Sequence, residues 1–191
     1  RNSTYICIVN TMELARKLEI LAAGARYDAS CASSGSSRRE SGGIGQALPA
    51  GVCHSFAGDG RCISLLKLLK SNVCRYDCAY CMNRASNGIE RAAFTTDELV
   101  SLTISFYRRN YIEGLFLSSG IYSDPDIVME GLIDVARTLR KVAGFAGYIH
   151  LKAIPGCGDA LLRAAGLYAD RLSANIELPT AHSLARLAPD K

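Results

Sequence analysis

Four strand-like runs, each followed by a segment with helical periodicity, constrain the fold of this chain more than any other feature. The runs cover residues 63–69, 115–117, 148–154 and 171–178. In the first run, Leu65-Leu66 and Leu68-Leu69 form the nearly continuous apolar pattern of a parallel strand that is covered on both faces. The strict alternation of strand and helix predicts a parallel β/α fold with right-handed crossovers.

The helices that follow these runs carry their own boundary signals. Thr95 and Glu98 have the spacing of a capping box at a helix start, and Asp124-Pro125 supplies an N-cap and a first-turn proline. The apolar stripes of these two helices consist of Leu99, Leu102 and Phe106, and of Val128, Leu132, Val135 and Leu139, with Gly144 closing the second helix. Shorter helices are predicted over residues 159–165 and after Thr180.

The region before the first strand divides into two parts. Residues 1–11 have no convincing pattern and stay unassigned. Residues 12–61 form an extension that begins with a helix, and this helix is predicted to end near Gly24. A Ser/Gly-rich loop follows from Cys31 to Gly45. It is either a solvated linker or an anion-binding loop in which backbone amides, Arg38 and Arg39 contact phosphate. Residues 62–191 are the predicted core.

Three cysteines, Cys74, Cys78 and Cys81, follow the first strand at a Cys-x3-Cys-x2-Cys spacing. Three thiolates can hold a [4Fe-4S] cluster and leave one iron without a protein ligand, whereas electron-transfer ferredoxins use four cysteines per cluster. A structural zinc site also needs four ligands, and no second pair follows here. The sequence favours the open cluster, with a zinc site and inert cysteines as the alternatives.

Further polar residues stand at or near the ends of the other predicted strands. Ser118-Ser119-Gly120 follows the second strand, Lys152 lies in the third, and Asn175 and Glu177 lie in the fourth. Chemistry in parallel β/α folds sits at this end of the strands. Alternation places Asn175 and Glu177 on one face, where Glu177 either binds a ligand or pairs with Lys152. His150 is interpreted as a satisfied core residue.

The cysteine spacing, with the aromatic Tyr80 before the last cysteine, resembles the radical S-adenosylmethionine (SAM) superfamily. The resemblance implies a partial (β/α) TIM-like barrel of about four β/α units, with a core that is incomplete at its C-terminal end. It also implies two cofactors, a [4Fe-4S] cluster and SAM. The cluster reduces SAM to methionine and a 5′-deoxyadenosyl radical, which abstracts hydrogen from the substrate.

The same resemblance implies roles for individual residues. Cys74, Cys78 and Cys81 would ligate the cluster, and Tyr80 would lie near the SAM adenine. Ser118, Ser119 and Gly120 stand where the superfamily often has Gly-Gly-Glu, whose backbone carbonyls bind the SAM amino group. Asn175 and Glu177 match the region that contacts the SAM ribose or methionyl group. No residue is assigned as catalytic.

A closer resemblance is carried by longer segments of the chain, from about Met12 to Lys191. The segments are residues 28–36, 93–95, 106–120, 150–156 and 175–180. They are similar to a bacterial branch of DNA modification and repair radical SAM proteins, which is associated with a uracil-DNA glycosylase-like protein. DNA and that protein are therefore the expected partners, together with an electron donor of the flavodoxin or ferredoxin type. Cys31, Cys53 and Cys62 belong to the branch's pattern, and whether they bind a second metal centre stays open.

Composition limits these interpretations only weakly. The net charge of +4 permits a polyanionic partner without requiring one. Eight cysteines could suggest disulfides, but the chain is not small, and the clustered spacing at residues 74–81 favours metal ligands in a reducing, cytoplasmic compartment. No run approaches the roughly 18 apolar residues of a membrane span. The alternatives to a DNA-modifying enzyme are a radical SAM enzyme acting on RNA, a peptide or a small metabolite, and a non-enzymatic iron–sulfur redox or structural module.

Overall fold

The computed structural model describes residues 12–27, 52–56 and 62–191. The predicted Ser/Gly-rich loop, with Cys31, Arg38 and Arg39, lies outside the described residues, as does the unassigned segment 1–11. In chain order the elements are α2 (Leu14–Ala25), β1 (Val52–Phe56), β2 (Cys62–Leu69), α3 (Thr96–Arg108), β3 (Gly114–Ser118), α4 (Pro125–Lys141), β4 (Tyr148–Lys152), α5 (Asp159–Gly166), β5 (Arg171–Ser173) and α6 (Ala181–Leu187).

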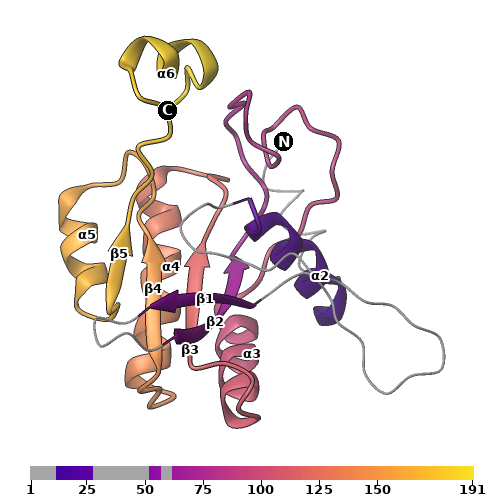
Figure 1. Cartoon of the computed structure of the whole chain (residues 1–191), viewed down its shortest axis with the longest axis vertical. Coiled ribbons are helices and arrows are strands. Elements are labelled where there is room, and N and C mark those ends of the chain that lie inside the picture. Colours follow the sequence, from indigo (N-terminus) through magenta and orange to yellow (C-terminus); the bar gives the residue numbers. More distant parts are fainter. Residues whose placement is uncertain (1–11, 28–51, 57–61) are drawn as a thin grey trace.

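The strands form one mixed sheet in the order β1-β2-β3-β4-β5. Strands β2 to β5 pair in parallel, each with its neighbour in the sequence, and β1 pairs antiparallel with β2. Figure 1 shows the parallel strands side by side, with their C-terminal ends at the top of the view and α6 beyond them. The predicted parallel β/α order is confirmed, whereas closure of these strands into a barrel stays a prediction.

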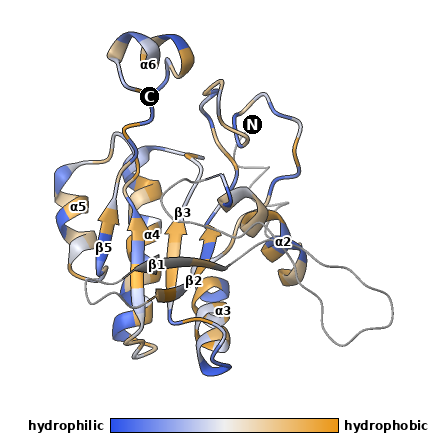
Figure 2. Cartoon of the chain, in the orientation of Figure 1, coloured by the Kyte–Doolittle hydropathy of each residue, from blue (hydrophilic) through white to orange (hydrophobic). Residues whose placement is uncertain are grey.

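Helices α3, α4 and α5 cover one face of the sheet. The core between them and the strands combines Leu66, Leu68, Leu115, Leu117, Ile149 and Leu151 from the sheet with Leu99, Val128, Leu132 and Leu139 from the helices, all of them buried. Figure 2 shows the strands mainly in the colour of hydrophobic residues, while the helices carry a polar side as well. Burial of this apolar surface supplies the main stabilising term of the fold.

The helix starts agree with the sequence signals that predict them. Thr95 accepts a hydrogen bond from the backbone N–H of Glu98, whose side chain in turn accepts one from the backbone N–H of Thr95. Asp124 accepts a hydrogen bond from the N–H of Asp126, and Pro125 occupies the first helical turn. These caps satisfy backbone donors that have no partner within the helix.

Strand β1 is an element that the sequence analysis misses. It crosses the face of the sheet opposite α3, α4 and α5, which we call the inner face (Figure 1). There Cys53 packs against Leu65 of β2 and Phe116 of β3. The antiparallel register pairs Phe56 with Cys62 and Cys53 with Leu65. The signal that could have found this hairpin is the Gly58-Asp59-Gly60 sequence between two short β-prone runs.

Helix α2 of the extension extends past Gly24, the residue predicted to end it, to Ala25. A side chain at Gly24 would place its Cβ 3.0 Å from Leu69 Cδ1 and 3.4 Å from Asn83 Oδ1, so the glycine serves close packing. Lys17, which is fully buried, forms an ion pair with Glu98 of α3 at 2.8 Å. These contacts fix α2 against the end of β2, beside the loop that carries the three cysteines.

Strand β5 is shorter than predicted, because it ends at Ser173 rather than at Leu178. The last bond to its neighbour runs from the Ala153 N–H to the Ser173 carbonyl at 2.8 Å. Beyond Ala153 the chain of β4 turns away at Gly156, which has a left-handed φ of 84°. No described strand therefore remains for residues 174–178 to pair with, and strand alternation does not apply to Asn175 and Glu177.

Candidate metal and cofactor site

One pocket lies at the C-terminal ends of β2, β3 and β4. It is lined by every residue that the sequence analysis assigns to the cluster or to SAM, namely Cys74, Cys78, Cys81, Tyr80, Ser118, Ser119, Gly120, Asn175 and Glu177. Its volume of about 210 Å³ is many times the roughly 10–15 Å³ of cavity that one water molecule needs, so it can hold more than a single ion. The ligand roles of these nine residues stay predictions, but their convergence on one pocket is a feature of the fold.

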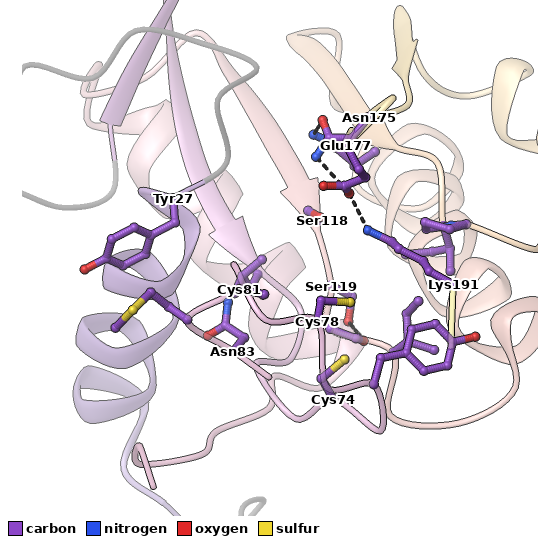
Figure 3. Close-up of a pocket in the computed structure, with 18 of the residues that line it drawn as sticks. Tyr27, Cys74, Cys78, Cys81, Asn83, Ser118, Ser119, Asn175, Glu177 and Lys191 are labelled. Carbon is purple, nitrogen blue, oxygen red and sulfur yellow. Dashed lines mark hydrogen bonds and ion pairs between the residues drawn. The ribbon is translucent and has the colours of Figure 1, made fainter. Parts of the chain in front are cut away.

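The three cysteines lie on one irregular loop, residues 70–94, which we call the cysteine loop. Short hydrogen bonds shape it, including Cys81 N–H to Cys78 O at 2.9 Å and Arg75 N–H to Ile121 O at 2.7 Å. Cys78 is 6% exposed, while Cys74 and Cys81 are half-buried. In Figure 3 the cysteines lie between Tyr27 on one side and Asn175, Glu177 and Lys191 on the other.

The environment of Cys78 holds its thiol in the neutral form when no metal is bound. Burial raises the pKa of Cys78, and the neighbouring Cys74 and Cys81 raise it further, while the Lys191 ammonium acts in the opposite direction. Metal ligation requires the thiolate, so a metal bound at this loop would displace protons, and higher pH would favour its binding.

The described residues contain no group of three His, Cys, Asp or Glu side chains that converges on one metal ion. In a four-iron cluster, by contrast, each cysteine binds its own iron, so the three sulfurs stand apart around a larger group. The three thiols line one pocket, and the group that they hold stays a prediction.

Ser118, Ser119 and Gly120 form the turn that leaves β3 beneath the cysteine loop. The carbonyl of Ser118 accepts a hydrogen bond from Lys70 N–H at 2.7 Å, and that of Gly120 accepts one from Ser119 Oγ at 2.8 Å. Within the described part of the chain, the Ser119 carbonyl is thus the acceptor of this turn that has no partner. Because Ser119 lines the pocket, its carbonyl can accept a hydrogen bond from a ligand.

Asn175 and Glu177 reach the same pocket by a different route from the one predicted. Glu177 has a left-handed φ of 64°, a conformation that costs energy for a residue with a side chain. Asn175 Nδ2 donates to Glu177 Oε1 at 3.3 Å, and Lys152 Nζ donates to Asn175 Oδ1 at 2.5 Å. Pairing with Lys152 is one of the two alternatives left open for Glu177, and its carboxylate forms an ion pair with Lys191 instead.

Lys191 is a site residue that the sequence analysis does not identify. Burial acts to raise the pKa of Glu177, but hydrogen bonds from Lys191, Asn175 and Tyr80 outweigh it and lower that pKa. The Lys191 ammonium also lies 6.0 Å from the centroid of the Tyr80 ring, within reach of a cation–π interaction. Burial and the Glu177 carboxylate raise the pKa of Tyr80, so its hydroxyl stays protonated and donates to Glu177.

The segment that carries Lys191 also contacts the cysteine loop directly. The Ala79 N–H donates to the Leu187 carbonyl at 2.8 Å, next to Cys78. Nothing in the local pattern around residues 187–191 indicates this contact, because it depends on how α6 packs beyond the sheet.

The remaining candidate residues lie elsewhere. His150 is buried on the inner face, with its Nε2 2.7 Å from Ser173 Oγ and its ring edge-to-face with Phe116, as expected of a satisfied core histidine. Cys53 and Cys62 belong to alternate positions of the β1–β2 hairpin, whose register directs their side chains to opposite faces. These two cysteines are therefore poorly placed to share one metal centre.

Comparison with known proteins gives a likeness of fold. No family profile matches this chain, and no curated protein matches it either. Among solved structures, the chain is similar to HydG, a maturase of the [FeFe]-hydrogenase, with 19% sequence identity and a TM-score of 0.52. The match covers 64% of this chain and 27% of HydG, so the chain spans about a quarter of that protein. None of the helices in the described ranges is long and apolar enough to cross a membrane.

Proposed function

We propose that this chain is a radical SAM enzyme, which binds a [4Fe-4S] cluster through Cys74, Cys78 and Cys81 and cleaves SAM reductively. The observation that carries the proposal is the pocket in which these cysteines meet the residues predicted to bind SAM. The fold likeness to HydG supports the general class and leaves the substrate open.

The residues of the pocket suit the two cofactors. When bound, the cluster supplies the electron that splits SAM into methionine and a 5′-deoxyadenosyl radical. The three thiols would hold the cluster, and the Ser119 carbonyl would accept a hydrogen bond from the SAM ammonium. Glu177, kept ionised by Lys191, would accept hydrogen bonds from ribose hydroxyls. Tyr80 would lie against the adenine.

The proposal predicts that the chain forms 5′-deoxyadenosine from SAM. The measurement is anaerobic: reconstitution with iron and sulfide, addition of dithionite and SAM, and chromatography of the products. Methionine and 5′-deoxyadenosine should appear in equal amounts, because both come from one bond cleavage, and neither should form without dithionite. A well-formed cluster that yields no 5′-deoxyadenosine would instead favour the redox or structural module.

DNA is the proposed substrate, and its support is the resemblance of the chain to the DNA modification and repair branch. A uracil-DNA glycosylase-like protein and a flavodoxin- or ferredoxin-type electron donor are the partners that this resemblance implies, in the cytoplasm. The net charge of +4 is compatible with a polyanion. The alternative substrates, RNA, a peptide or a small metabolite, share the same cofactor chemistry.

A DNA substrate predicts salt-dependent binding to duplex or single-stranded DNA. If the chain contacts about two phosphates, its affinity for DNA should fall roughly tenfold between 50 and 200 mM salt, because counterions are released on binding. Fluorescence anisotropy with labelled duplex DNA, single-stranded DNA and RNA measures this slope. Binding that is absent, or unchanged across the salt range, would argue against DNA, and a preference for RNA would favour the first alternative.

A further inference from the structure

The cysteine loop is closed at its neck by backbone and side-chain hydrogen bonds. The Phe94 N–H donates to the Lys70 carbonyl at 2.8 Å, which joins the two ends of the loop. One step further in, the Asn72 side chain donates to the Glu90 carbonyl at 2.8 Å and accepts from the Ala92 N–H at 2.7 Å. The loop is therefore a compact unit with adjacent ends.

Arg91 fills the inside of this loop. One guanidinium nitrogen, Nη1, donates to the carbonyls of Asn72 at 2.6 Å and Asn83 at 2.9 Å. The other, Nη2, donates to the carbonyls of Arg84 at 2.7 Å and Asn87 at 2.9 Å. A planar group with five fixed donors is suited to hold four carbonyls in one arrangement. It also satisfies acceptors that the irregular backbone leaves without partners.

These carbonyls come from both sides of the cysteine motif. Asn72 stands two residues before Cys74, whereas Asn83 and Arg84 stand two and three residues after Cys81. Arg91 thereby fixes the distance between the two ends of the motif. The carbonyl of Cys81 itself accepts from the backbone N–H and from Nη1 of Arg84, both at 3.3 Å, which continues the same network to the last cysteine.

We propose that Arg91 is a positioning residue that sets the spacing of the three cysteines before the cluster arrives. The identity of the group they hold rests on the proposed function, but the bracing of the loop does not. In many small metal-binding domains, the site is ordered only when the metal binds. A loop braced by Arg91 keeps its shape without metal, so that it can capture a preformed cluster and retain it.

The test compares Arg91→Gln and Arg91→Lys with the matched control Arg75→Gln, an exposed arginine of the same loop. The first readout is amide hydrogen exchange of the metal-free chain, at Cys81 and Ala85, whose N–H groups bond to the carbonyls of Cys78 and Tyr76 at 2.9 Å. The second is the rate at which a chelator strips iron from the reconstituted chain, followed by absorbance.

We expect Arg91→Gln to speed exchange at these two amides at least tenfold, with the amides of β3 and β4 unchanged. Iron should be lost about 10–100-fold faster, the usual effect of removing a group that orients metal ligands. Arg91→Lys keeps the charge but not the planar fork, and should behave like Arg91→Gln. Arg75→Gln should match the wild type.

Three results would overturn the proposal. Unchanged exchange at Cys81 and Ala85 in Arg91→Gln would show that the loop holds its shape without the guanidinium. Exchange that rises equally in β3 and β4 would show that Arg91 contributes to global stability rather than to the loop alone. An Arg91→Lys variant that behaves like the wild type would show that a positive charge suffices and that the planar guanidinium is not needed. A wild-type chain that takes up no iron would contradict the proposed function, and the exchange data would still decide the role of Arg91.

Discussion

Replacing Cys78 with alanine should abolish cluster binding, lowering the iron content from about four per chain to near zero. Cys78 is the most buried of the three cysteines, and among the described residues no fourth cysteine lines the pocket to take its place. With two thiolates left, two irons of the cluster lack a protein ligand, and water or chelators can attack them. The visible absorbance of the reconstituted chain and its iron and sulfide content measure the loss.

The matched control is Cys157→Ala, which removes a half-buried thiol that does not line the pocket. This variant should keep its full iron content and its 5′-deoxyadenosine formation. Cys74→Ala and Cys81→Ala should reproduce the loss seen for Cys78→Ala, because each thiolate holds a different iron. A Cys78→Ala chain that retains about four irons would contradict the three-cysteine site, and one zinc per wild-type chain would favour the structural module.

Local signals made the parallel part of the fold predictable. The capping box of Thr95 and Glu98 and the N-cap at Asp124 depend on a few neighbouring residues, and both are present in the structure. Because parallel strands end at one edge of the sheet, the topology alone brings Cys74, Ser118 and Lys152 to one pocket. The candidate site therefore followed from the order of the elements rather than from any single motif.

Contacts between distant segments made the rest unpredictable. Strand β1 owes its position to Leu65 and Phe116, and β5 stops where β4 turns away, so neither boundary is encoded in its own residues. The pattern at Asn175 and Glu177 does suit a strand, yet the strand lacks a neighbour there. Lys191 and Arg91 are ordinary surface residues by composition, and only the folded loop and α6 bring them to the site.

Gly120→Ala should destabilise the chain and distort the pocket together. A Cβ at this position would lie 2.4 Å from the Val73 carbonyl oxygen, closer than such atoms approach, and 3.2 Å from that of Ser71, which is a tight contact. Both contacts are to backbone atoms at the start of the cysteine loop, and backbone cannot rotate away as a side chain would. Such overpacking costs about 1–3 kcal/mol, and for a domain of this size each kcal/mol lowers Tm by about 2–4 °C.

We expect the loss of stability in Gly120→Ala to be steric. A matched control, Gly166→Ala, adds the same methyl group where nothing obstructs it. Gly166, at the end of α5, has nothing within 4 Å of the added Cβ, so Gly166→Ala should be neutral or stabilise by up to about 1 kcal/mol through helix propensity. Thermal unfolding of the metal-free chains, followed by circular dichroism, compares the two. If Gly120→Ala melts with the wild type, the turn after β3 does not lie against the start of the cysteine loop. Ser118, Ser119 and Gly120 would then lose their place beside Cys74, since that place depends on the same close approach.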